Sequence, residues 1–242
     1  RELLALIHPA LEAYFVPKGV GMATVLVIGA SRGIGRGVVQ ACLERGDRVI
    51  ATVRKADDAQ ALRAAGAEVL VVDVAQPASV SGLAWQLDGV ELDQAWYVAG
   101  AWDGASAHTP PTQQDFDRVM HTNVLGLMQV LPQVMPCVEA AGGTMVCISS
   151  MMSRLSQAES GAWLYRTSKA ALNMVVACAQ DAWKSTRVVA MDPGWVQTDM
   201  GGPGALITVE ECVHGMLATV AQLDEADKGA LVRYDGHRWE DW

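Results

Sequence analysis

Short apolar segments recur along most of the chain, and each is followed by a stretch with helical spacing. Apolar residues succeed one another in these segments without polar alternation, so both faces of each strand are expected to be buried. Strands of this kind need helices on both sides, which is the arrangement of a parallel sheet with right-handed helical crossovers. The predicted strands are 24–29, 48–53, 68–73, 93–100, 144–150, 186–194 and 229–236.

The intervening stretches complete the predicted fold. The predicted helices are 34–45, 57–65, 78–87, 113–140, 160–184 and 208–222. Pro132 and Pro136 are expected to end or bend the fourth of them. We therefore expect an α/β protein with a Rossmann-type, doubly wound sheet of about seven parallel strands. The pattern shows no gap, so residues 22–242 are expected to form one domain.

Composition narrows the possible functions. The chain has 242 residues, of which 51% are hydrophobic, and this suffices for one buried core. The net charge of -9 and the lack of Lys/Arg clusters argue against a nucleic-acid partner and an anionic membrane surface. No uninterrupted apolar run is long enough to cross a bilayer. Five scattered cysteines without a CxxC motif indicate reduced, buried thiols, so we expect a cytoplasmic protein.

Residues 1–21 precede the first predicted strand and differ from the rest. Their apolar spacing indicates a short amphipathic helix, which Pro9 disfavours, and they lack the features of a secretory signal. Met22 stands directly before the first strand and could be a natural start. We expect residues 1–21 to be an N-terminal extension, either a native helix or an artificial addition.

The sequence GASRGIG, residues 29–35, joins the first predicted strand to the first predicted helix. Gly29 permits a tight turn, while Gly33 and Gly35 let the backbone approach a diphosphate at the helix N-terminus. Glycines at this junction favour a bound dinucleotide over a glycine-rich turn without a ligand. The candidate binding residues here are Gly29, Ser31, Arg32, Gly33, Ile34 and Gly35.

Basic residues follow the second predicted strand. An acidic residue there would bind the ribose hydroxyls of NAD, whereas a basic residue accommodates the extra phosphate of NADP. Arg54 and Lys55 occupy this place, and Arg32 in the glycine loop could reach the same phosphate. The alternative is that these are solvated surface charges. We expect NADP(H) to be favoured over NAD(H).

Further motifs occur in a fixed order. Ala99 and Gly100 follow the fourth strand, Asn123 lies in the long helix, Ser150 follows the fifth strand, and YRTSK (165–169) and DPGWVQTDM (192–200) come next. Over residues 22–242 this order resembles the short-chain dehydrogenase/reductase family. The sequences YRTSKAALN and PGWVQTDMGG and the tail YDG…W are similar to its branch of C-factor-type and sniffer-type carbonyl reductases.

The resemblance implies roles for individual residues. Tyr165 would donate a proton to a substrate carbonyl, Ser150 would hydrogen-bond that carbonyl, and Asn123 would hold a relay water. Lys169 would hold the nicotinamide ribose and lower the pKa of the phenol. The implied cofactor contacts are Asp73, Val74, Ala99, Gly100, Tyr165, Lys169, Pro193, Gly194, Val196 and Thr198.

The spacing of Tyr165 and Lys169 is compatible with this chemistry. Residues four apart lie on one helix face, although alone such a pair is most often a half-buried Tyr beside a snorkelling Lys. A free Tyr has a pKa of about 10. Lowering this pKa by about three units requires roughly 4 kcal/mol of differential stabilisation of the phenolate. An ammonium group and an oxidised nicotinamide are suitable sources of this stabilisation.

The chain departs from the family pattern in three places. Ile28 replaces a Thr whose hydroxyl ties the glycine loop to the loop after the fourth strand, and Tyr97 and Val98 replace two amides in that second loop. The gap from Ser150 to Tyr165 is longer than usual. Ser149 and Ser153 are therefore alternatives, although strand position favours Ser150.

Aromatic residues and histidines near the predicted site allow two interpretations. His108 and His121 form no ligand cluster, so no metal is expected. Trp102, Trp163 and Trp195 lie on loops or helix starts, where aromatic packing is the first interpretation and a substrate pocket wall is the second.

The function expected from the sequence is NADP(H)-dependent hydride transfer between the nicotinamide and a small-molecule carbonyl or alcohol. The rival is a non-catalytic dinucleotide-binding protein for signalling or redox sensing. Neither fold nor motif sets the substrate. The apolar helices 113–140 and 160–184 imply, by the same resemblance, a homodimer or homotetramer.

Overall fold

The computed structural model describes residues 22–242. The helix expected within residues 1–21 lies outside the described residues.

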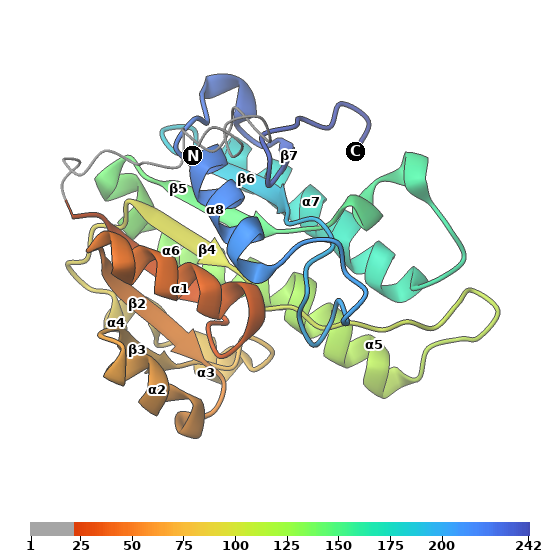
Figure 1. Ribbon diagram of the computed structural model, residues 1–242, viewed down its shortest axis with the longest axis horizontal. Helices are drawn as coiled ribbons and strands as arrows, with labels where there is room; N and C mark the ends of the chain where they lie inside the picture. The colour runs from red at the N-terminus through yellow and green to blue at the C-terminus, as the bar shows by residue number, and fades with distance from the viewer. Residues whose placement is uncertain (1–21) are drawn as a thin grey trace, which may run out of the picture.

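A seven-stranded parallel sheet forms the centre of the molecule, with the strand order β3-β2-β1-β4-β5-β6-β7 (Figure 1). The predicted fold class is confirmed. The order reverses between β1 and β4, and ligands of doubly wound sheets bind outside the carboxyl ends at such a switch point. The strands are β1 Thr24–Ile28, β2 Arg48–Val53, β3 Glu68–Val71, β4 Gln94–Tyr97, β5 Thr144–Ile148, β6 Arg187–Asp192 and β7 Leu231–Arg233.

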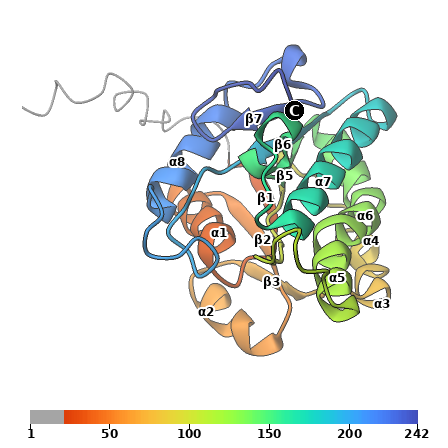
Figure 2. The same cartoon turned by 90° about the vertical axis from the view of Figure 1, so that its right-hand side faces the viewer.

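Helices cover both faces of the sheet, as Figure 2 shows. One face carries α1, α2 and α8, and the other carries α3, α4, α5, α6 and α7. The predicted helix 78–87 is two short helices, α3 and α4. The helices are α1 Gly33–Arg45, α2 Ala59–Ala64, α3 Pro77–Val80, α4 Leu83–Gln86, α5 Gln113–Met120, α6 Gly126–Ala141, α7 Trp163–Ala182 and α8 Val209–Val220. Short 3-10 turns include η4 Met151–Ser153, which follows β5.

The strands bury both faces because successive side chains point to opposite sides. Val25 and Val27 of β1 belong to the core under α1 and α8, whereas Leu26 and Ile28 belong to the core under α6 and α7. All four are fully buried. This explains why the strands read as uninterrupted apolar runs.

The long helix after β4 runs through both of its prolines. Of the two expected effects, an end or a bend at Pro132 or Pro136, the end does not occur, because α6 continues to Ala141. A proline inside a helix removes a hydrogen bond, yet Leu127, Val130 and other apolar residues of α6 stay packed in the core. The irregularity lies earlier, in a π-helical turn, η3 His121–Leu125, which joins α5 to α6.

The helix from Gln113 to Ala141 spans 29 residues, and by length and composition alone it could cross a membrane. It is not an uninterrupted apolar run, because it contains Asp115, Asp117 and Arg118. Its buried residues pack against the sheet and α7, as in the core helix of a globular protein.

The expectation of buried thiols is met only in part. All five cysteines are free, and Cys42, Cys147 and Cys212 are buried. Cys137 is half-buried, and Cys178 is exposed on α7.

Candidate active site

The glycine loop between β1 and α1 lies tightly against the loop that follows β4. Gly29 has a φ of 92° and Gly33 has a φ of 52°, which L side chains rarely adopt. A Cβ on Gly29 would lie 2.7 Å from the Ala99 nitrogen, and one on Gly35 would lie 2.2 Å from the Gly29 oxygen. Only glycine therefore fits at these positions.

The N-terminus of α1 opens directly from this loop. Its first turn contains no acidic residue, and the side chain of Arg32 at the N-cap accepts no hydrogen bond from the helix. The first N–H groups and the positive end of the helix dipole thus remain available for an anion. This cradle fits the diphosphate of a dinucleotide. Ser31 and Ile34 are half-buried beside it.

A hydroxyl tie to the glycine loop comes from a residue that the sequence analysis did not select. The Gly29 N–H donates to Oγ1 of Thr52 at 3.2 Å. Thr52 lies on β2 and is buried. It supplies a hydroxyl to the loop although Ile28 has none. The only signal in the sequence was one polar residue in an apolar strand.

The basic residues predicted to select the cofactor lie at the carboxyl edge of the sheet. Arg54 directly follows β2 and is exposed. The guanidinium of Arg32 pairs instead with the carboxylate of Asp199 at 3.0 Å, and both side chains are about three-quarters exposed. Arg32 would have to leave Asp199 to reach a phosphate.

The remaining predicted cofactor residues follow the ends of β3 and β6. Asp73 and Val74 follow β3, where Oδ1 of Asp73 accepts from the Ala75 N–H at 3.0 Å. Val74 is buried. Pro193 and Gly194 follow β6.

The segment after Gly194 turns back toward the glycine loop. Val196 is buried and forms a bridge with Ile207. A Cβ on Gly33 would lie 3.2 Å from Cγ2 of Thr198. The structure thus brings Thr198, the last of the predicted cofactor residues, next to Gly33 in the glycine loop.

Asn123 lies in η3 and clamps the loop after β4. Its Oδ1 accepts from the Ala101 N–H at 2.7 Å, and its Nδ2 donates to the Ala101 oxygen at 2.9 Å and to Oγ of Ser168 at 2.8 Å. A Cβ on Gly100 would lie 3.7 Å from Oδ1 of Asn123 and 3.8 Å from Nζ of Lys169. Asn123, Gly100 and Lys169 therefore meet.

Tyr97 stands where the family pattern has an amide side chain. It supports the π-helical turn η3, which contains Asn123. Its hydroxyl donates to the Thr122 oxygen at 2.6 Å, next to Asn123 in the chain. Gly126 leaves room for this phenol, since a Cβ there would lie 2.6 Å from the hydroxyl oxygen. The ring is fully buried. The altered loop thus gains a different tie to the helix that carries Asn123.

The three candidate serines have different partners. Oγ of Ser149 donates to Oδ1 of Asn173 at 2.6 Å, and Nδ2 of Asn173 donates to Oγ of Ser153 at 2.8 Å. Oγ of Ser150 accepts from the Met152 N–H at 3.1 Å, and Ser150 is the serine whose side chain lowers the pKa of Tyr165. Ser149 and Ser153 are thus both bonded to Asn173, whereas Ser150 is not.

Tyr165, Lys169 and Asn173 lie four residues apart along α7 and face the end of β5. Nζ of Lys169 donates to the Ile148 oxygen at 2.7 Å and lies 5.6 Å from the centroid of the Tyr165 ring. Both side chains are buried. Desolvation lowers the pKa of Lys169 to about 8.

Without a cofactor, the protein raises the pKa of Tyr165 above its ordinary value. Burial raises it, the hydrogen bond from Ser150 opposes this, and the charge of Asp192 raises it further. The lowered pKa expected for catalysis therefore requires a change at the site, such as the positive charge of an oxidised nicotinamide.

Asp192 at the end of β6 is a second residue that the sequence analysis did not select. It is 1% exposed; its Oδ1 accepts from the Gly194 N–H at 3.1 Å, and its Oδ2 has no partner among the described residues. Burial raises its pKa. A carboxyl group at the end of an apolar strand was the available signal.

Comparisons with known proteins agree with this geometry. The family described as short chain dehydrogenase matches residues 23–204. A 1-hydroxy-2-glutathionyl-2-methyl-3-butene dehydrogenase of Rhodococcus sp. (strain AD45) is 32% identical, over 89% of this chain and 98% of its own length.

Two solved structures are similar in fold. The carbonyl reductase Sniffer of D. melanogaster has a TM-score of 0.83 and 24% identity, covering 90% of this chain and 98% of its own. A short-chain dehydrogenase/reductase from Burkholderia multivorans with bound NADP has a TM-score of 0.79 and 29% identity, with 90% and 98% coverage.

Proposed function

The chain belongs to the short-chain dehydrogenase family of oxidoreductases, and from this premise we propose that it is an NADP(H)-dependent carbonyl reductase or alcohol dehydrogenase with Tyr165 as its acid and base. One observation carries the proposal. Tyr165, whose pKa Ser150 lowers, lies beside Lys169, and Lys169 meets Asn123 and Gly100 at the sheet edge where the glycine loop forms a dinucleotide cradle.

Each of these residues has a chemical task in the proposal. Bound NADPH supplies the hydride. Tyr165 donates a proton to the carbonyl oxygen, and Ser150 holds that oxygen by a hydrogen bond. Lys169, which donates to the Ile148 oxygen, would hold the nicotinamide ribose hydroxyls of a bound cofactor, and its charge would stabilise the phenolate. Asn123 keeps the loop after β4 in place and holds a relay water.

The rival function is dinucleotide binding without chemistry, and a screen separates the two. Aldehydes and ketones of varied shape are mixed with the protein and NADPH, and the loss of NADPH absorbance is followed. Turnover of any carbonyl compound supports the reductase. Tight NADPH binding without turnover of any compound would favour a signalling or redox-sensing protein.

Arg54 is expected to give NADPH a preference of about one to two orders of magnitude over NADH. Charge-assisted bonds to a phosphate contribute roughly 1.5–3 kcal/mol each, and exposure at this edge reduces that. The variant Arg54→Asp removes the phosphate partner and adds repulsion, so it should lower kcat/KM for NADPH far more than for NADH.

The measurement is the ratio of the two kcat/KM values in the wild type and the variant. Arg63→Asp is a matched control, because Arg63 is an exposed arginine on α2 that bonds the Val69 oxygen. Its ratio should equal that of the wild type. Equal use of both cofactors by the wild type would show that Arg54 is only a solvated charge.

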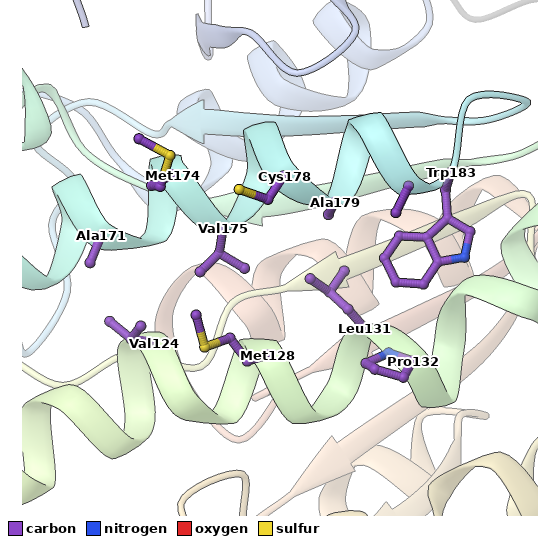
Figure 3. Close-up of a pocket in the computed structure, with 11 residues that line it drawn as sticks. Val124, Met128, Leu131, Pro132, Ala171, Met174, Val175, Cys178, Ala179 and Trp183 are labelled. Carbon is purple, nitrogen blue, oxygen red and sulfur yellow. The ribbon is translucent and has the colours of Figure 1, made fainter.

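We also propose that the chain assembles through α6 and α7. These helices run side by side, and an apolar groove between them is lined by Met128, Leu131, Ala171, Met174, Cys178 and Trp183 among others (Figure 3). Met128 is 52% exposed and Met174 is 65% exposed. Burying such side chains against a second copy is favourable, at ~25 cal/mol per Å² of apolar surface.

Light scattering at micromolar concentration should therefore show a homodimer or homotetramer. Met174→Glu places a charge in the groove and should shift the protein toward monomers. Trp85→Glu changes another exposed side chain, on α4, and should leave the assembly unchanged. A monomeric wild type would contradict the proposed assembly.

The cytoplasmic location expected from the cysteines remains a proposal. It is supported by the free thiols of the described residues.

A further inference from the structure

Trp102 lies in the loop after β4 and contacts the proposed acid. The centroids of its ring and the Tyr165 ring are 4.6 Å apart, and the ring planes are tilted by 57°. Trp102 is nevertheless 37% exposed, while the large side chains of the core, such as Trp96, are fully buried. Part of the indole therefore remains open beside the Tyr165 ring.

Neighbouring groups hold Trp102 in this position. Asn123 bonds both polar backbone groups of Ala101, and Nη1 of Arg118 donates to the Trp102 oxygen at 3.0 Å. The same loop is tied to the segment before α7, because the Ala107 N–H donates to the Ser160 oxygen at 2.8 Å. These bonds hold the backbone of the loop from which the indole of Trp102 reaches the Tyr165 ring.

Other large apolar side chains are exposed on the loops that follow β5, which pairs with β4, and β6, which pairs with β5. They are Met151, Leu155, Trp195, Met200 and Leu206. Nε1 of Trp195 donates to the Gly201 oxygen at 2.8 Å, which fixes this second indole. The carboxyl edge of β4, β5 and β6 therefore presents apolar surface from three successive loops.

Three arginines around these loops form ion pairs. Arg154 bonds Asp241, Arg166 bonds Glu159, and Arg32 bonds Asp199. Because their guanidinium groups already bind carboxylates, these arginines are not placed to bind an anionic substrate. An apolar surface with few polar groups selects a ligand by its shape and its apolar area.

We propose that the substrate carbonyl is attached to an aromatic or other bulky apolar group, and that Trp102 determines this specificity by packing against that group. The proposal rests on the carbonyl reductase function inferred above. A flat ring bound at the open part of the indole lies beside Tyr165, which places a carbonyl attached to it within reach of the phenol.

The test compares kcat/KM for 2-naphthaldehyde and propanal with NADPH in the wild type, Trp102→Ala and Trp102→Phe. Trp102→Ala should lower kcat/KM for 2-naphthaldehyde by at least about tenfold, mainly through KM, and change that for propanal by less than about threefold. Trp102→Phe keeps an aromatic surface and should retain most of the activity with 2-naphthaldehyde. Trp85→Ala, a Trp that is 83% exposed on α4, should match the wild type with both aldehydes.

Two other results have different meanings. Equal losses with both aldehydes in Trp102→Ala would show that Trp102 only supports Tyr165, and would overturn the inference while the reductase function stands. No turnover of any aldehyde by the wild type would overturn the reductase function and the inference with it.

Discussion

Replacing Tyr165 with Phe should lower turnover by two orders of magnitude or more. The variant keeps the ring that packs against Trp102 but removes the only proton that the residue can donate. Burial and the contact with Trp102 should hold the Phe in place, so binding of NADPH should change little. The measurement is kcat for any carbonyl compound that the wild type reduces, together with the Kd for NADPH.

Tyr234→Phe removes a hydroxyl from another tyrosine and provides a matched control. Its turnover should stay close to that of the wild type. If Tyr165→Phe retained near-normal turnover, the assignment of the acid would be wrong, and a different group would have to donate the proton.

Replacing Lys169 with Met should also lower turnover by at least about two orders of magnitude, because it removes the ammonium that lies 5.6 Å from the centroid of the Tyr165 ring. The same variant should not unfold more easily than the wild type at pH 7 without cofactor. Met keeps the apolar stem and removes a charge that is buried at a cost.

The pH dependence of stability follows from the pKa of Lys169, which is lowered from 10.5 to about 8 in the folded protein. Between these values the unfolded chain binds more protons than the folded one, so the free energy of unfolding rises with pH from about 8 to 10.5. Below about pH 8 the cost of the buried charge is fully present, and it amounts to roughly 3 kcal/mol. The bond to the Ile148 oxygen is part of the environment that sets this value.

Thermal unfolding of both proteins from pH 7 to pH 10 measures this difference. The gap in Tm between Lys169→Met and the wild type should shrink as the pH rises. Lys184→Met removes a lysine whose side chain is 78% exposed and should leave the pH dependence unchanged. A gap in Tm that did not depend on pH would show that the ammonium of Lys169 is not destabilised by burial.

Local patterns in the sequence were sufficient to predict the fold. Three features depend only on residues that are close together in the sequence. They are an apolar strand buried on both faces, a glycine at a positive φ, and a pair of residues four apart on a helix. The strands near 24–29 and 144–150, the turn at Gly29 and the shared face of Tyr165 and Lys169 could therefore be predicted. At Pro132 and Pro136 the sequence allowed an end or a bend, and the helix does not end there because α6 stays packed in the core through both prolines.

The partners of the polar side chains depended on tertiary structure. A hydrogen bond requires about 3 Å between atoms from distant segments, and no local pattern specifies such a distance. Asn173 bonds Ser149 and Ser153 while Ser150 meets Tyr165, and the sequence left these three serines as alternatives.

The replacements for the missing family groups were likewise visible only in three dimensions. Thr52 reaches the glycine loop from the adjacent strand, and Tyr97 reaches the Thr122 oxygen across the core. The sequence by itself thus determined which elements form and which end of the sheet carries the site. Only the packing of those elements decided which side chains meet there, because that depends on strand order and on how closely α6 and α7 approach the sheet.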